Sequence, residues 1–120
     1  MELQFLFRQP IFPIVANIEG LFVGAKTPKA LASQLARIPF ENEKFYDMVD
    51  SRGEGWSIYT PKMLISPLTI KKRWTKREII ELFNERENWE LADGKMYSER
   101  SLSAKRLDKI IFDLVDLSTK

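Results

Sequence analysis

The sequence predicts an α+β fold, in which a mostly antiparallel sheet of hairpins forms a single layer and about three amphipathic helices pack on it. Three observations lead to this prediction. Short apolar stretches repeat with the two-residue period of strands, three other stretches have helical spacing, and the helices fall between groups of strands. The 120 residues, 44% of them hydrophobic, are enough for one domain over residues 1–120 with one buried core.

The first predicted elements are a strand and a hairpin. Residues 3–8 alternate, which places Leu3, Phe5 and Phe7 on one face of a strand. The prolines at positions 10 and 13 then mark an edge or a bend, because proline cannot donate to a sheet ladder. Two β-prone runs follow around residues 17–20, where Gly20 suits a left-handed turn position.

A short helix is predicted to begin at residue 28. Thr27 can cap its N-terminus, and Pro28 suits the first helical position, where a missing N–H costs nothing. Leu31, Leu35 and Ile38 fall on one face, which predicts an amphipathic helix that ends before the proline at position 39.

Residues 44–65 return to the pattern of strands, with a turn at residues 51–55. The glycines of this turn do not indicate a nucleotide site, because a phosphate loop would end in Gly-Lys-Ser/Thr and open a helix. Pro61 interrupts the second run and predicts a bend or two short strands.

The next helix has the clearest start in the sequence. Thr75 and Glu78 have the spacing of a capping box, and Trp74 and Ile79 are placed to form a hydrophobic staple around it. The apolar stripe continues through residues 79–83, and the helix is expected to end near Asn88.

The C-terminal part predicts a hairpin and a last helix. Asp93-Gly94 is a pair that readily adopts the positive φ angles of a tight hairpin turn. Ser101 or Ser103 is the expected cap of the last helix. Its apolar stripe consists of Leu107, Ile110, Ile111 and Leu114.

The composition removes most enzyme chemistry. The chain has no histidine and no cysteine, so the usual general base, nucleophilic pairs and metal ligands are missing. We expect no cofactor, metal or catalytic residue, although lysine or carboxylate chemistry stays open. Asp47 and Asp50 should point to opposite faces of a strand. Asp113 and Asp116 share a face near the end of the last helix, which is interpreted as solvated.

The absence of cysteine favours a cytoplasmic protein without disulfides. The N-terminal apolar residues are interrupted too early, by Arg8, Pro10 and Pro13, for a membrane span, and Glu2 stands where a signal peptide is positive. We therefore expect no membrane partner.

A basic run precedes the second helix and supplies the candidate binding residues. These are Lys71, Lys72, Arg73, Trp74, Lys76 and Arg77. Cations at a helix N-terminus oppose the helix dipole, which makes the run a candidate for function. The capping box explains Trp74 structurally, and Arg77 can pair with Glu81 one turn on.

Four interpretations of the basic run stand beside one another. A solvated approach to the helix has the greatest weight, and contact with an acidic protein surface or a second copy of the chain comes next. Nucleic acid follows, with Trp74 and Trp89 as stacking groups, and a small anion comes last. A DNA groove is disfavoured because the outward helix face would carry Arg77 against three glutamates, a charge of −2. That face consists of Arg77, Glu78, Glu81, Asn84, Glu85 and Asn88.

Phe112 is the candidate residue for self-association. It lies off the stripe of the last helix, so it either contacts another element or is exposed. The favoured function is a small non-enzymatic protein-binding domain, of the interaction or inhibitor type, that could form a homodimer. The alternative is a nucleic-acid-binding accessory protein that uses the same cluster.

Overall fold

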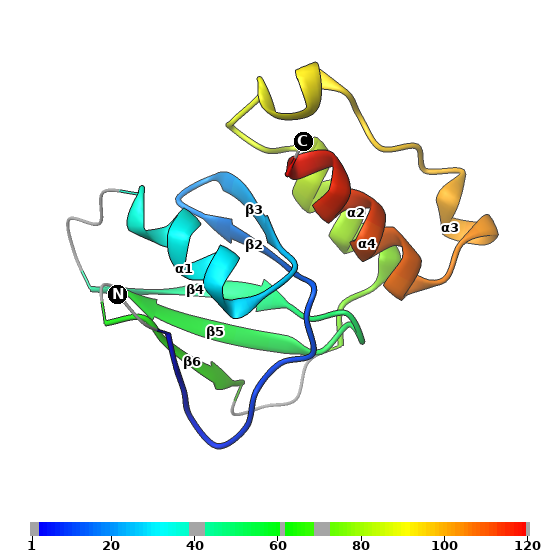
Figure 1. The fold of residues 1–120 in the computed structure, drawn as a ribbon. Helices are drawn as coiled ribbons and strands as arrows, with labels where there is room; N and C mark the ends of the chain where they lie inside the picture. The colour runs from blue at the N-terminus through cyan, green and yellow to red at the C-terminus, as the bar shows by residue number, and fades with distance from the viewer. Residues whose placement is uncertain (1–2, 39–42, 61, 69–72, 120) are drawn as a thin grey trace.

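The computed structural model describes residues 3–38, 43–60, 62–68 and 73–119, and its central element is a six-stranded sheet (Figure 1). The strand order is β1-β6-β5-β4-β2-β3, and only β1 and β6 pair in parallel. The strands are β1 (Gln4–Phe5), β2 (Ile14–Ile18), β3 (Leu21–Ala25), β4 (Lys44–Val49), β5 (Gly55–Thr60) and β6 (Leu64–Pro67). The predicted α+β class with a mostly antiparallel sheet is confirmed.

Helices cover both faces of this sheet. They are α1 (Pro28–Ala36), α2 (Lys76–Asn84), α3 (Ser101–Ala104) and α4 (Leu107–Ser118), with a 3₁₀ turn, η1 (Leu91–Gly94), after α2. Figure 1 shows α1 over one part of the sheet and α2 beside α4 near the β2-β3 hairpin. The sheet is a single layer, as predicted, but it separates two apolar clusters instead of closing one core.

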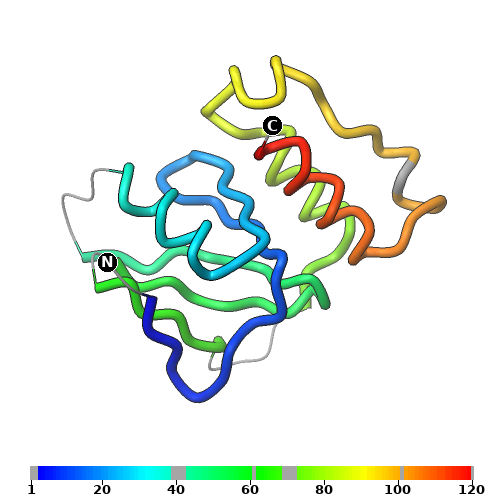
Figure 2. The backbone as a smooth tube through the Cα atoms, in the orientation of Figure 1, coloured from blue at the N-terminus to red at the C-terminus, as the bar shows by residue number. Residues whose placement is uncertain are grey.

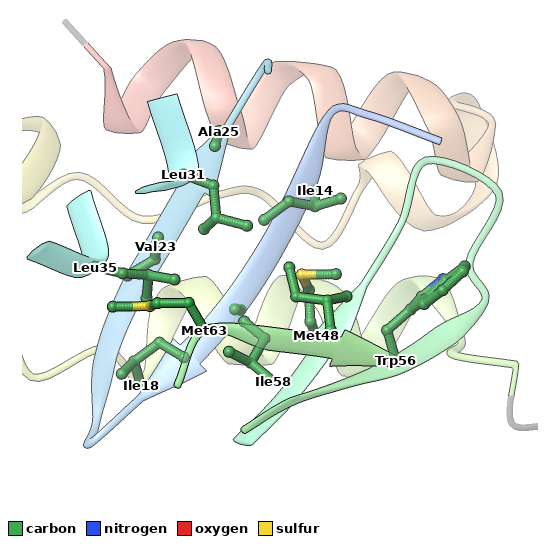
Figure 3. Close-up of a cluster of buried hydrophobic side chains, with 12 residues drawn as sticks. Ile14, Ile18, Val23, Ala25, Leu31, Leu35, Met48, Trp56, Ile58 and Met63 are labelled. Carbon is green, nitrogen blue, oxygen red and sulfur yellow. The ribbon is translucent and has the colours of Figure 1, made fainter. Parts of the chain in front are cut away.

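The first cluster fills the space between α1 and the sheet. Leu31 and Leu35 reach from α1 to Ile14 and Val23 on the hairpin, and Trp56 closes the cluster on β5 (Figure 3). The side chains of these residues are fully buried, except that Val23 keeps a small exposed fraction of 4%. The predicted helix face is thereby confirmed, and its burial supplies the main stabilisation of this half.

The second cluster lies on the opposite face, under α2 and α4. Strand β2 alternates, so that Ile14 and Ala16 face the first cluster while Val15 faces the second. From the helices come the buried side chains of Ile79, Ile80, Phe83, Ile110, Ile111, Leu114 and Val115. A strand that is apolar on both faces requires cover on both sides, which explains the two clusters.

The local start and turn signals of the first half are confirmed. The hairpin turns at Glu19 and Gly20, both with positive φ, as a two-residue turn of this kind requires. Thr27 accepts the Ala30 amide at the start of α1, and Pro28 is the first helical residue. A turn separates β4 from β5, and β6 forms a strand of its own. Pro61 lies outside the described residues.

The capping box of α2 is also confirmed, but the end of the helix is not. Thr75 accepts the Glu78 amide at 3.2 Å, and the Glu78 carboxylate accepts the Thr75 amide at 2.9 Å. The helix ends at Asn84 rather than near Asn88. It stops early because Asn88 and the Glu87 amide are bound to the β2-β3 hairpin instead.

The N-terminal strand is shorter than predicted. Gln4 and Phe5 pair with β6, and Leu6 still donates to Ile65 at 2.8 Å. The chain then turns at Phe7, whose φ is 71°, so the expected face of Leu3, Phe5 and Phe7 breaks after its second member. Leu3 and Phe5 pack on the first cluster, whereas Phe7 points into solvent.

The predicted hairpin around Asp93-Gly94 is wrong, because this segment is a 3₁₀ turn with no paired strands beside it. Ala92, Asp93 and Gly94 all have positive φ. The carbonyl oxygens of Leu91 and Lys95 accept hydrogen bonds from the guanidinium of Arg86. The backbone groups that a ladder would use are therefore taken by a side chain from the end of α2.

The last helix also begins later than expected. The segment Ser101–Ala104, which contains both expected caps, forms a separate one-turn helix, α3, that ends before α4 begins. Arg106 occupies the N-cap position of α4 without a side-chain cap hydrogen bond. The apolar stripe itself is confirmed, with Leu107 half-buried and the rest fully buried. Burial of the stripe thus sets the position of the helix without a serine cap.

Candidate functional site: an arginine cluster around the turn between β4 and β5

The turn at residues 50–54 is organised by a buried carboxylate. Asp50 has no exposed surface, and its Oδ1 accepts the backbone amides of Arg52 and Glu54 at 2.9 and 3.1 Å. Its Oδ2 accepts the indole N–H of Trp56 at 3.1 Å and lies 3.4 Å from the amide of Ile11. Because hydrogen-bond donors surround this buried carboxylate, Asp50 holds the turn in its shape.

A second carboxylate in the turn holds Arg8. Glu54 is 6% exposed, and both of its oxygens accept from the Arg8 guanidinium, one of them at 2.9 Å. The guanidinium also lies over the Trp56 ring, 4.8 Å from its centre. The hydrogen bond to Glu54 raises the pKa of Arg8 above its ordinary value, with burial opposing the shift.

The basic run meets this turn at Arg73. Its Nη1 donates to the carbonyl of Arg52 at 3.2 Å, and Arg73 forms an isolated bridge with Glu54. The next residue, Trp74, donates its amide to Gly53 at 2.8 Å. Three arginines from separate segments, Arg8, Arg52 and Arg73, therefore surround one turn, and we call them the arginine cluster.

The arginine cluster presents its charges to solvent. The side chains of Arg8 and Arg52 are about half exposed, and Arg73 is exposed. Arg52 lies 3.6 Å from Glu54 and 4.0 Å from Asp50, both of which are buried. Among the described residues, three cations stand against two carboxylates, an excess of one positive charge. The cations face outward and their partners inward, so a ligand would meet the guanidinium groups first.

The other described cations of the basic run point elsewhere. Lys76 donates to the carbonyl of Leu102 at 3.1 Å, and Arg77 lies 3.6 Å from Glu99 rather than pairing with Glu81 as predicted. Both tie the start of α2 to the segment before α4. Lys71 and Lys72 lie outside the described residues. The structure thus divides the run, and of its described cations only Arg73 joins the arginine cluster.

The two tryptophans proposed as stacking groups differ in position. Trp74 is half-buried and packs with the second apolar cluster, which agrees with the predicted staple. Trp89 is 54% exposed, packs against Gly94, and has the Arg86 guanidinium 5.4 Å from its ring centre. They lie on different parts of the molecule, so they do not form one stacking surface.

Sequence reasoning missed Arg8 and Arg52. Each is a lone cation among uncharged or acidic neighbours, and the pairing of turn 50–54 with residues 8–11 is visible only in the fold. Ser51 donates to the Ile11 carbonyl through both its amide and its hydroxyl. The one sequence signal was that Glu54 is an acidic residue in a tight turn, and this does not identify its partner.

A second polar cluster lies between α4 and the segment before it. Asp113 accepts hydrogen bonds from Tyr97, Lys105 and Lys109 at 2.7, 2.8 and 2.9 Å. Burial disfavours its charge, but these hydrogen bonds outweigh burial and lower the pKa of Asp113 from 3.8 to about 2. The interpretation of Asp113 as a solvated helix end is therefore wrong. Asp116 pairs with Lys26 at 2.7 Å.

Phe112, the predicted self-association residue, is 45% exposed on α4. Its neighbours Asp113 and Asp116 have the charge opposite to that of the basic run, but both already pair with lysines of the same chain. Of the two alternatives predicted for Phe112, contact with another element or exposure, the structure has the side chain exposed, and the carboxylates beside it are already paired.

Within the described ranges, no three or more acidic residues gather closely enough to hold a metal ion. Nor does any helix in these ranges have the length and apolar character needed to span a bilayer. Comparison of the chain with models of known families, with curated protein sequences and with solved structures finds no match.

Proposed function

We propose that this chain is a small cytoplasmic, non-enzymatic protein-binding domain that meets an acidic protein surface through the arginine cluster. The observation that carries this proposal is the convergence of Arg8, Arg52 and Arg73 around a turn whose own carboxylates are buried. Arginine suits such contacts because its planar, weakly hydrated head forms paired hydrogen bonds with carboxylates. Lys71 and Lys72, next to Arg73 in sequence, extend the basic character.

The weak net charge of the cluster favours protein over nucleic acid. Affinity for a phosphate backbone grows with each neutralised phosphate, and a dedicated surface carries many uncompensated cations. Here Asp50 and Glu54 offset two of the three arginines. Nucleic acid remains the second candidate because Lys71, Lys72 and Arg73 are consecutive in the sequence.

Direct titration separates these two functions. Labelled poly-L-glutamate of about 20 residues and single- and double-stranded DNA of similar charge are titrated by fluorescence anisotropy at low and moderate salt. We expect the native chain to bind polyglutamate more tightly than either DNA. Arg52→Glu with Arg73→Glu should weaken polyglutamate binding by at least about tenfold, as the loss of interface arginines typically does.

Lys29→Glu with Lys62→Glu is the matched control, because it makes the same charge change on exposed residues outside the arginine cluster. The control should bind as the native chain does. If both double variants lose the same polyglutamate affinity, the loss comes from the change in net charge alone, and the proposal is contradicted. Tighter DNA binding with a steep salt dependence would favour the nucleic-acid function.

A further inference from the structure

A protruding phenylalanine stands beside the arginine cluster. Phe7 is 93% exposed and has a φ of 71°, and the Arg8 amide donates to the Leu6 carbonyl across it at 2.8 Å. This is a γ-turn with a positive central φ, a rare and strained conformation that concentrates at functional sites. Leu6 and Ile11, both partly exposed, extend the apolar surface.

This turn is held at both ends, so Phe7 is presented rigidly. On one side, Leu6 donates to Ile65 of β6. On the other, Arg8 is bound to Glu54 and stacks on Trp56. An exposed aromatic side chain on a fixed turn loses little conformational entropy on binding and suits a preformed pocket on a partner.

The chain itself carries a hollow of matching character. About 370 Å³ in volume, it is lined by Glu90, Leu91, Ala92, Asp93, Lys95 and Leu117. Its apolar lining would receive a phenyl ring, which even a cavity of about 150 Å³ can hold. At its surface two carboxylates, Glu90 and Asp93, stand against one lysine, Lys95, while the Arg86 guanidinium is buried beneath them and is bound to backbone carbonyls. The exposed charged groups are therefore more negative than positive, which complements Arg8. A second hollow, of about 190 Å³ beside β3, is lined by Arg37 and no acidic residue, so it lacks this complement.

The hollow is preformed because a buried arginine fixes its wall. Arg86 is 4% exposed, and its guanidinium donates to the carbonyls of Phe83, Leu91 and Lys95 at 2.7–2.9 Å. These bonds join the end of α2 to both ends of η1. The turn therefore keeps its shape without a ligand, as a receiving pocket should.

From this complementarity we infer that the chain associates with itself, with the Phe7 turn of one copy entering the hollow at Glu90 to Leu117 of the next. Phe7 supplies the apolar anchor, and Arg8 lies against the carboxylates of Glu90 and Asp93. The inference rests on the proposed function, and it identifies the acidic partner surface as a second copy of this chain.

The positions of the two features make this contact head-to-tail. In Figures 1 and 2, the blue segment before β2 lies at the lower end of the molecule and the yellow turn of η1 at the upper end. The molecule measures 38 Å along its longest axis. One copy therefore offers a turn at one end and a hollow at the other, a head-to-tail contact that builds rings or open chains instead of pairing the same surface of two copies.

Two variants, each altered at one end, test the contact. The turn variant is Phe7→Asn, since asparagine tolerates a positive φ and leaves the fold intact. The hollow variant combines Glu90→Gln, Ala92→Asn and Asp93→Asn, which removes both carboxylates and makes the floor polar. Asparagine again suits the positive φ at Ala92 and Asp93. Far-UV circular dichroism checks that both variants are folded.

Sedimentation equilibrium from about 10 µM to 1 mM gives the readout, since a small interface binds in this range. The native chain should form species that grow with concentration beyond dimers. Each variant alone should associate at least about tenfold more weakly, because an anchor residue or its pocket is lost. An equimolar mixture should form a one-to-one dimer that does not grow, because one intact turn and one intact hollow remain.

Three outcomes would overturn the inference: a native chain that stays monomeric, a turn variant that associates like the native chain, and a mixture that fails to form dimers. Phe112→Asp is the control for another exposed aromatic residue, and it should associate normally. If Phe112→Asp alone abolishes association, the interface lies on α4. Because Phe7→Asn keeps all three arginines, its unchanged polyglutamate binding would leave the proposed function standing while the self-association fails.

Discussion

At the scale of single residues, the polar groups with the strongest influence on the stability of the folded state are those that the fold surrounds with hydrogen-bond partners. Asp113 is the clearest case, since Tyr97, Lys105 and Lys109 all donate to it. The hydrogen bond from Lys105 to Asp113, together with one from Lys105 to the Tyr97 hydroxyl, raises the pKa of Lys105. A carboxylate of this kind stabilises the folded state only while it is ionised.

We expect Asp113 to make the stability of the protein depend on pH in the acid range. Its folded pKa, about 2, lies below the unfolded value of 3.8, so its contribution is complete above about pH 5 and disappears as the pH falls through 2. Asp113→Asn should lower the free energy of unfolding at pH 7 by about 1–2 kcal/mol and flatten its decline between pH 5 and 2. Urea unfolding at a series of pH values measures both effects.

The exposed Asp47→Asn is the control, because Asp47 lies on β4 away from this cluster. It should leave the decline between pH 5 and 2 unchanged. If Asp113→Asn shows the same slope as the native chain, the acid sensitivity has another source.

At the scale of elements, the sheet closes its two edges in different ways. The edge at β3 is covered by side-chain amides. Asn88 accepts the Phe22 amide at 2.9 Å and donates to the Phe22 carbonyl at 3.0 Å, and Gln34 donates to the Gly24 carbonyl at 2.6 Å. The edge at β1 is only two residues long and ends in the Phe7 turn. Both devices prevent another strand from pairing with the sheet.

We expect Asn88→Asp to uncover the β3 edge. The carboxylate can still accept the Phe22 amide, but it cannot donate to the Phe22 carbonyl and repels it. A loss of about 1–3 kcal/mol in the free energy of unfolding should follow, as for a buried group left without its hydrogen bond. Amide hydrogen exchange at Phe22 and Gly24 should accelerate, which NMR measures directly.

Asn84→Asp provides a matched control at the last residue of α2, four residues before Asn88. Asn84 forms the same two-bond arrangement with the backbone of Tyr97, at 2.7 and 3.0 Å, but outside the sheet. It should cost a similar free energy while leaving exchange at Phe22 unchanged. Faster exchange at Phe22 in both variants would indicate a general loss of stability instead of an uncovered edge.

At the scale of the whole described structure, the turn between β4 and β5 is where separate parts meet. Gly53 accepts the Trp74 amide from the approach to α2, and a Cβ at Gly53 would lie 3.1 Å from Leu107 of α4. The N-terminal segment joins the same turn through Arg8 and Ile11. The sheet, both helices of the second cluster and the proposed binding surface therefore share one loop.

We expect Gly53→Ala to destabilise the fold by about 2 kcal/mol or more, because it combines a positive φ with crowding against Leu107. Gly94→Ala is the comparison, since Gly94 has a similar φ but a Cβ there would lie 3.4 Å from Trp89, an ordinary contact. It should cost only about 1 kcal/mol. Urea unfolding of both variants isolates the packing contribution, and equal losses would show that Leu107 moves aside without cost.

Signals that act over three or four residues were predictable from the sequence. The cap at Thr27, the capping box at Thr75 and Glu78, and the turn at Gly20 each depend on neighbouring groups only. The apolar stripe of α4 was also predictable, because its buried residues repeat with the helical period. Errors arose where a distant group competed, as when Arg86 bound the backbone that would have formed a hairpin around Asp93.

The candidate site was only partly predictable. Arg73 was found because it lies in a dense run of charge, whereas Arg8 and Arg52 are isolated in sequence. Their meeting depends on the pairing of Ser51 with Ile11, 40 residues apart. Lys76 had no partner among its neighbours in the sequence, and in the fold its ammonium group donates a hydrogen bond to the Leu102 carbonyl.

The sequence by itself determined the α+β class, the starts of α1 and α2, and the absence of histidine and cysteine chemistry, because these follow from composition and from interactions between near neighbours. The tertiary structure decided that two apolar clusters flank the sheet, that Asn88 ends α2 early, and that three distant arginines share one turn. Such contacts join residues far apart in the chain, and their partners are chosen by packing and by the need to satisfy buried polar groups.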